Sequence, residues 1–250
     1  MQSFSPRSDE VQQWNMEATR ALVKQIQGAE RLERISLSLR SIGYRRAYAL
    51  YHLTEARRVL DDYVEAEVGD LPIIIAAGIK ESGRDAFQVA YSQVGAHVTA
   101  CLQCLHSTTD LLGFAIYLAL NLGAINRKPP ENRIVAGDVL RMLRSEASLA
   151  QIALNMAPML ESEQFRHLDA IVNQGKHRHL VEPSFSENFD GPMPDRHYVL
   201  IPAFKRDDAW HPAVPARRFI LDLYNAGSLH LVRTGNALNE ALRQRVAISE

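Results

Sequence analysis

A long stretch of apolar positions, residues 86–126, dominates the hydrophobic pattern of the chain. It holds one formal charge, Asp110, and no proline, and its apolar residues are spread around the helical circumference. A helix that is apolar on nearly all sides packs in the middle of a domain. The pattern therefore predicts a long central helix, with Gly95 and Gly113 as candidate bends, against which the other helices pack.

Helical periodicity also precedes this stretch. Apolar residues recur at steps of three and four over residues 11–32, and the pattern extends toward Leu39 before an expected break around Gly43. A second helix is predicted over residues 44–67. Residues 73–79 are apolar throughout but too few to distinguish a strand from a buried turn of helix.

The second half of the chain shows three further helical patterns. Residues 136–160 read as helical with a break near Pro158, and another helix begins at Ser162. Residues 217–248 form a long amphipathic pattern that closes the chain.

A proline-rich segment interrupts this helical texture. Residues 183–216 contain six of the eleven prolines, which excludes a continuous helix. Residues 198–201 are a strand candidate and Asp207–Asp208 a turn, so a small hairpin is expected there. The sequence thus predicts an all-α helical bundle around a long apolar central helix, in a single domain over residues 1–250, with an irregular or β insertion.

Composition narrows the class of protein. Hydrophobic residues make up 46% of the 250, enough for a sizeable core, and the net charge is −1. A near-neutral chain lacks the overall basic balance of a strong nonspecific nucleic-acid binder, although a local patch is compatible with it. The first residues carry no apolar signal segment, and the most lipid-like run, residues 111–125, is too short to span a bilayer. We expect a cytoplasmic protein with no membrane partner.

The first candidate site is a line of polar residues on the predicted central helix. His106 and Asp110 are four residues apart, so their side chains can hydrogen-bond on one helical face. A buried carboxylate needs a partner, so Asp110 should meet a cation or open onto a cleft. The alternative is a buried network that only fixes the register of the helix. The full line is Thr99, Gln103, His106, Asp110, Tyr117 and Asn121.

The second candidate is a basic cluster at the end of the helix that begins near Ser162. Cations stabilise a helix C-terminus, and this effect alone is sufficient to explain the run. Alternatively, Asn173 and His177 line a cleft in which neighbouring cations bind phosphate or assist acid–base chemistry on a phosphodiester. The cluster consists of Asn173, Lys176, His177, Arg178 and His179.

Metal chemistry has less support. His97, Cys101 and Cys104 share a helical line, but a structural zinc site needs four ligands and no fourth is evident, so buried thiols are the preferred interpretation. His177 and His179 with Asp110 have suitable residue types for a metal and nothing further in their favour. We therefore predict neither a metal nor a cofactor.

The apolar central segment with its HSTTDLL sequence, together with the later VNQGKHRHL, resembles the HEPN-like superfamily of helical proteins, in particular a bacterial branch with an N-x-x-K-H-R signature. The resemblance covers residues 84–250. It implies a homodimer and, as in many members, metal-independent cleavage of RNA.

The superfamily's motif is an arginine, often followed by a polar residue, with four to six residues between the arginine and a catalytic histidine. Asn173 and His177 match the polar residue and the histidine, whereas Val172 stands at the arginine position. An arginine and a histidine with a separation in this range also occur at residues 46–52 and 206–211.

Two hypotheses follow from the resemblance. In the first, the protein cleaves RNA or binds RNA or a nucleotide. His177, Asn173 and Lys176 would then be catalytic, and Arg178, His179, His106 and Asp110 would bind. In the second, it is a non-catalytic helical interaction module or scaffold.

Overall fold

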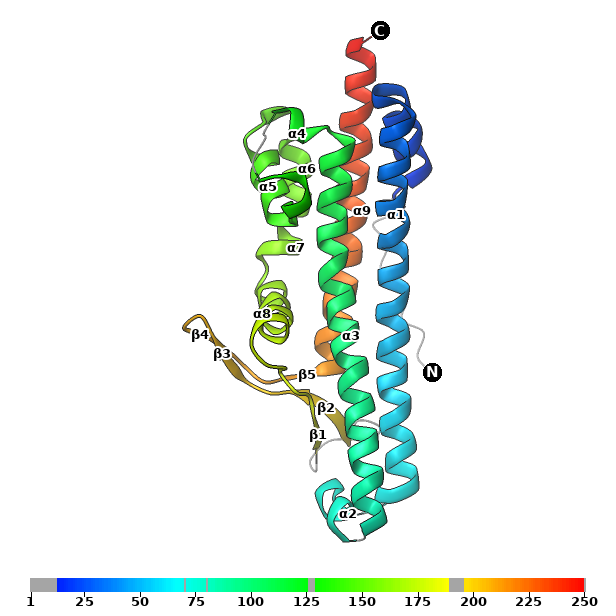
Figure 1. Cartoon of the computed structure of the whole chain (residues 1–250), viewed down its shortest axis with the longest axis vertical. Coiled ribbons are helices and arrows are strands. Elements are labelled where there is room, and N and C mark those ends of the chain that lie inside the picture. Colours follow the sequence, from blue (N-terminus) through cyan, green and yellow to red (C-terminus); the bar gives the residue numbers. More distant parts are fainter. Residues whose placement is uncertain (1–12, 70, 80, 126–128, 189–195, 250) are drawn as a thin grey trace. The chain divides into compact units, whose positions relative to one another are not determined.

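The computed structural model describes residues 13–69, 71–79, 81–125, 129–188 and 196–249 (Figure 1). The fold is mostly helical with a small antiparallel sheet, which confirms the predicted fold class. The longer helices are α1 (Met16–Tyr63), α3 (Glu81–Ala119), α5 (Ala136–Arg144), α8 (Glu163–His177) and α9 (Ala216–Ser249). The shorter ones are α2 (Ile73–Ile79), α4 (Leu122–Ile125), α6 (Ala150–Met156) and α7 (Pro158–Glu161), with a π-helical turn at Val64–Val68 and 3₁₀ turns at Glu131–Arg133 and Ala147–Leu149.

Internal contacts divide the chain into two compact units. Unit 1 comprises Met1–Ile42, Thr109–Ser162 and Asn225–Glu250, and unit 2 comprises Gly43–Thr108 and Glu163–Tyr224. Each unit has its own cluster of buried apolar residues. The single domain over residues 1–250 stays a prediction.

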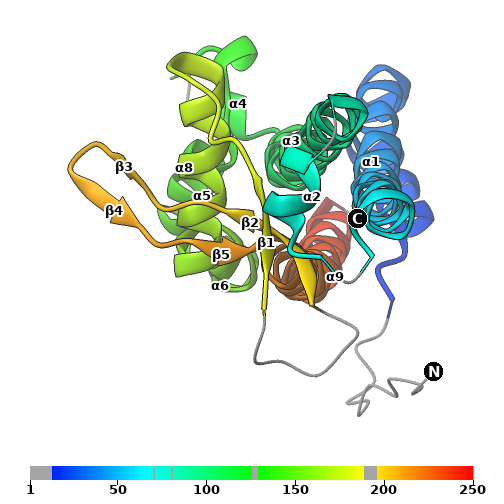
Figure 2. The ribbon, with the colours of Figure 1, turned by 90° about the horizontal axis from the view of Figure 1, so that it is seen from below.

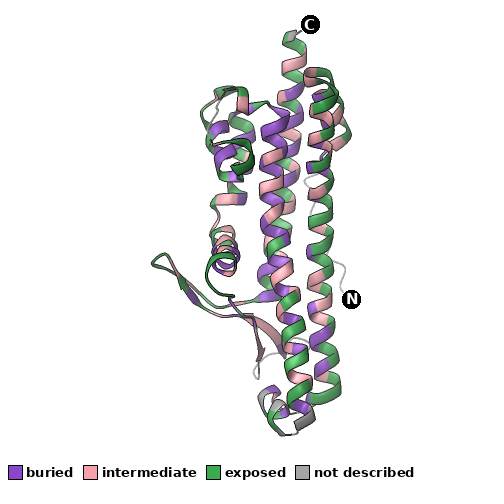
Figure 3. Ribbon diagram, viewed as in Figure 1, coloured by how far each residue is buried: buried purple, intermediate pink, exposed green. Residues whose placement is uncertain are grey.

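Apolar residues of the stretch predicted as the central helix are buried along both parts of α3, and its central position in the chain as a whole stays a prediction. Its C-terminal part supplies Leu112, Ile116 and Leu118 to the core of unit 1, all fully buried. Figure 3 shows buried positions along α3. Its earlier part supplies Val98 and Cys101 to the core of unit 2. Among the described residues, no helix combines the length and the apolar character that crossing a bilayer requires.

The central helix is shorter than predicted. Helix α3 ends at Ala119, and Asn121 has a φ of 51°, in the left-handed region that asparagine tolerates at helix ends. Gly113 has a packing role, because a Cβ there would lie 2.8 Å from the Cα of Ala136. The glycine thus allows the start of α5 to approach α3 closely.

The first two predicted helices are joined into α1. The expected break at Gly43 is wrong, because residue 43 is helical. The interruption lies at Gly28, whose φ of 83° and ψ of −173° depart from helical values. Glycine adopts such a φ without the Cβ penalty of other residues. Gly69, with a φ of 55°, follows the π-helical turn after α1.

Unit 2 contains the β structure of the proline-rich segment. Strands β1 (Ser184–Glu187), β2 (His197–Ile201) and β5 (Val214–Pro215) form a sheet in the order β1-β2-β5, with both pairs antiparallel. Strands β3 (Phe204–Arg206) and β4 (Ala209–His211) form a separate hairpin, which extends beyond that sheet (Figure 2). Residues 189–195 of the predicted insertion lie outside the described residues.

Two predictions for the proline-rich segment are confirmed. The strand expected at residues 198–201 is confirmed as β2, and the turn at Asp207–Asp208 connects β3 and β4. Both aspartates have positive φ, 46° and 63°, which is typical of a two-residue hairpin turn. Residues 73–79, which the sequence left open, form the helix α2.

Candidate functional site

A polar cleft of about 460 Å³ lies in unit 2, between the C-terminal end of α8 and the β3–β4 hairpin. We call it the α8 cleft. From the helix and the residues after it come Asn173, Gln174, His177, Arg178 and His179. The hairpin contributes Lys205, Arg206 and Asp207. Four of the seven predicted site residues therefore line one cleft.

The end of α8 positions the basic cluster. Lys176 and His177 occupy the last turn, where the negative end of the helix dipole favours cations. The next residue stays on the helical path, because the N–H of Arg178 donates to the carbonyl of Gln174 at 2.9 Å. The Gln174 amide also contacts the His179 ring, with 3.2 Å between Nε2 atoms. Lys176, predicted to be catalytic, is exposed and is not among the residues that line the cleft.

Arg206 connects the hairpin to α8. Its Nη1 donates to the backbone carbonyls of Asp169 at 3.3 Å and Ala170 at 3.4 Å, and its Nε lies 3.1 Å from Asp207. Lys205 pairs with the neighbouring turn aspartate, Asp208, at 2.8 Å. Sequence reasoning found this turn but missed that the two cations before it line the same cleft as His177.

A hydrogen-bonded network runs from α3 to α8. His106 Nε2 lies 3.0 Å from Asp169 Oδ1, and the same oxygen accepts from Asn173 Nδ2 at 2.8 Å. The His106 hydrogen bond is the main cause that lowers the pKa of the Asp169 carboxyl, although burial opposes it. His106 is itself buried and stacks on Phe165. The network fixes the turn of α8 that carries Asn173.

Asp110 has a different setting in unit 1. Its Oδ1 accepts from the backbone N–H of Ala136 at 3.0 Å, at the first residue of α5. A carboxylate is stabilised at such a helix N-terminus. The role of Asp110 alongside His177 stays a prediction.

Cys101 and His97, which the sequence placed on one helical line, each contact another residue of unit 2. Cys101 contacts the carbonyl of Ala49 at 3.1 Å, and burial raises the pKa of its thiol to about 12. His97 pairs with His52, with 3.0 Å between their Nδ1 atoms. Within the described ranges, no group of three or more His, Cys, Asp or Glu side chains is arranged to hold a metal ion.

No protein-family model matches this chain, and neither a curated protein nor a solved structure matches it. The likeness to the HEPN-like superfamily therefore stays an expectation from the residue pattern.

Proposed function

We propose that this protein binds single-stranded RNA through the α8 cleft and cleaves it without a metal ion. The observation that carries the proposal is the convergence of two basic segments, one at the end of α8 and one in the hairpin, around histidines. The helix dipole explains cations in the last turn of α8. It does not explain why Lys205 and Arg206 line the same cleft.

The cations supply the phosphate contacts. Arg206 is anchored to α8 by two carbonyls, so its charge is held beside the helix end. Arg178 lies one residue beyond α8 and is exposed. Guanidinium groups bind phosphate oxygens with two parallel hydrogen bonds, which suits a backbone phosphodiester. These two arginines would replace the arginine of the superfamily motif, because Val172 at that position is buried.

His177 would supply the acid–base chemistry. An imidazole nitrogen can accept the proton of an RNA 2′-hydroxyl while that oxygen attacks the adjacent phosphorus. The bond between phosphorus and the 5′-oxygen breaks, the departing 5′-oxygen takes a proton from water, and a 2′,3′-cyclic phosphate remains. Asn173, held by its hydrogen bond to Asp169, would orient the phosphate or the sugar.

A cleavage assay with labelled single-stranded RNA in the presence of a chelator tests the chemistry. Wild-type protein should cut, and His177→Ala should lose cleavage while binding changes only slightly. Cleavage that survives in His177→Ala, with the same product ends, would remove His177 from the mechanism.

Salt dependence tests the phosphate contacts separately. Arg178→Gln and Lys205→Gln should each lower the slope of log affinity against log salt by about 1, since each removes one phosphate contact. Arg58→Gln is the matched control, because Arg58 carries the same charge but pairs with Glu55 and Asp62 on α1. Equal slopes for all variants would refute the assigned cleft.

A non-catalytic interaction module is the second candidate function. The buried Val172 favours it, because the position of the superfamily's arginine then offers no cation to the scissile phosphate. Wild-type protein that binds RNA in a salt-dependent way but never cuts it would select this alternative.

We also infer a homodimer, which the superfamily resemblance implies. Support comes from aromatic residues on one side of α1: Tyr44, Tyr48 and Tyr51 are 53%, 50% and 57% exposed. Aromatic residues are enriched at protein interfaces. Sedimentation should give twice the 28.1 kDa chain mass, and Tyr48→Glu should shift it toward the monomer. A monomer at micromolar concentration would contradict the inference.

A further inference from the structure

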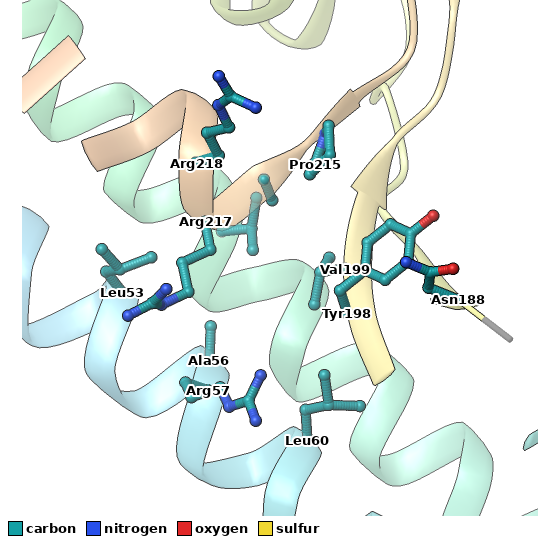
Figure 4. A pocket seen from close by; sticks show the side chains of 12 residues that line it. Leu53, Ala56, Arg57, Leu60, Asn188, Tyr198, Val199, Pro215, Arg217 and Arg218 are labelled. Atoms are coloured by element: carbon teal, nitrogen blue, oxygen red, sulfur yellow. The ribbon is translucent and has the colours of Figure 1, made fainter. Parts of the chain in front are cut away.

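A second cavity in unit 2, of about 430 Å³, lies on other residues than the α8 cleft (Figure 4). We call it the arginine cavity. Its walls come from α1, α3, the strands β2 and β5, and the start of α9. Pockets that bind drug-sized molecules have volumes of about 300–1,000 Å³, so the arginine cavity has the volume of a small-molecule site.

The floor of the arginine cavity is apolar. Leu60 of α1, Val98 of α3 and Val199 of β2 line the cavity together with Leu53, and we call these four side chains its floor. Leu60 and Val98 are each 1% exposed, so the floor is part of the core of unit 2 and is held rigidly. An apolar group that enters would bury its surface against preformed walls.

Cations line the same cavity. Arg57 is fixed by an ion pair to Asp61 at 2.7 Å and by a hydrogen bond to the His197 carbonyl at 3.4 Å. Figure 4 shows Arg217 directed toward the side where Arg57 and Leu53 lie, whereas Arg218 points away. Two arginines therefore line the same cavity as the apolar side chains.

The position of Arg217 is not explained by helix stability. It follows Ala216, the first residue of α9, and the first turn of that helix has no acidic residue. A cation at a helix N-terminus is disfavoured by the dipole. An anion bound between the arginines would remove this repulsion.

We propose that the arginine cavity binds a small organic carboxylate with an apolar body. The carboxylate lies between Arg217 and Arg57, whose planar donor groups match its two oxygens. The apolar body covers Leu60, Val98 and Val199. Tyr198 and Asn188 line the opposite wall (Figure 4). This site does not depend on the function assigned to the α8 cleft.

Calorimetric titration of the full chain with decanoate tests the proposal. Decanoate should bind, 1-decanol should bind at least tenfold more weakly, and inorganic phosphate should not compete. The alcohol keeps the body without the charge, and phosphate offers the charge without the body. Decyl phosphate in a parallel titration distinguishes a carboxylate site from a general anion site.

Variants locate the site. Arg217→Ala, at an exposed residue, should weaken decanoate binding at least tenfold, and Leu53→Trp should weaken it by filling the cavity. Arg58→Ala, on α1 but outside the cavity, should bind as wild type, and so should His177→Ala from the α8 cleft. Circular dichroism of each variant verifies that it is folded.

Three results would overturn the proposal. Equal affinity for decanoate and 1-decanol would leave only an apolar crevice, and tighter binding of decyl phosphate would make phosphate the preferred head group. Unchanged binding in folded Arg217→Ala would place the carboxylate elsewhere. None of these results bears on RNA cleavage, so the two proposals fail separately.

Discussion

The contact between His106 and Asp169 gives a quantitative test of how α8 is held. A hydrogen bond to a charged group contributes about 1.5–3 kcal/mol when it is well shielded. The side chain of Asp169 is 44% exposed, so solvent screening reduces the expected value to about 1 kcal/mol. In His106→Leu the carboxylate keeps its hydrogen bond from Asn173 and its access to water, so no buried charge is stranded.

A double-mutant cycle with His106→Leu and Asp169→Ala isolates this interaction. Urea unfolding followed by circular dichroism should give a coupling of about 1 kcal/mol at pH 7. Because the folded-state pKa of Asp169 lies below its ordinary value of 3.8, the contribution is complete above that value. It should not fall between pH 7 and pH 5, and it should be lost as the pH falls through the lowered pKa.

Two results would refute this reasoning. A coupling near zero at pH 7 would mean that the carboxylate prefers water to the imidazole. A coupling that disappears above pH 5 would mean that another group, with a higher pKa, controls the contact. Either result would also remove the network as the support of Asn173.

Three further predictions concern the buried parts of both units. Cys101 should resist alkylation by iodoacetamide at pH 8 in the folded protein and react after unfolding, as seen by mass spectrometry, since burial raises its pKa to about 12. Gly235→Ala should lower the free energy of unfolding by about 1–3 kcal/mol, because its Cβ would lie 2.0 Å from the Trp14 ring. Gly227→Ala, on the same helix with no atom within 4 Å, should instead be neutral or stabilising. Thr19→Val should cost about 1–3 kcal/mol in urea unfolding, because the Thr19 hydroxyl links the Trp14 indole to another buried polar side chain.

The long helices could be predicted because their apolar period is uninterrupted. The pattern over residues 217–248 gives α9 to within one residue at each end, after a proline that excludes an earlier start. The apolar period did not reveal the interruption within α1 or the residue at which α3 ends. Gly28 leaves the helical path while Gly43 stays on it, and no difference in the periodicity around the two glycines reveals this.

The candidate site was predictable only where its residues are consecutive in the sequence. Residues 173–179 form one basic run, so the sequence brings them together without knowledge of the fold. Arg206 joins them through carbonyls 36 and 37 residues earlier in the chain, a contact that depends on how the hairpin packs on α8. His106 likewise reaches Asp169 across 63 residues, whereas the sequence suggested Asp110 as its partner.

The ion pairs at the hairpin turn decide whether the α8 cleft can accept a phosphate. Asp207 and Asp208, which pair with Arg206 and Lys205, are 81% and 96% exposed. Pairs with such exposed carboxylates contribute little, about 0–1 kcal/mol, because water competes for both charges. A phosphodiester that offers bidentate hydrogen bonds can therefore replace them at small cost. The hairpin thus holds its cations in place through the backbone contacts of Arg206 while it leaves their charge available to a ligand.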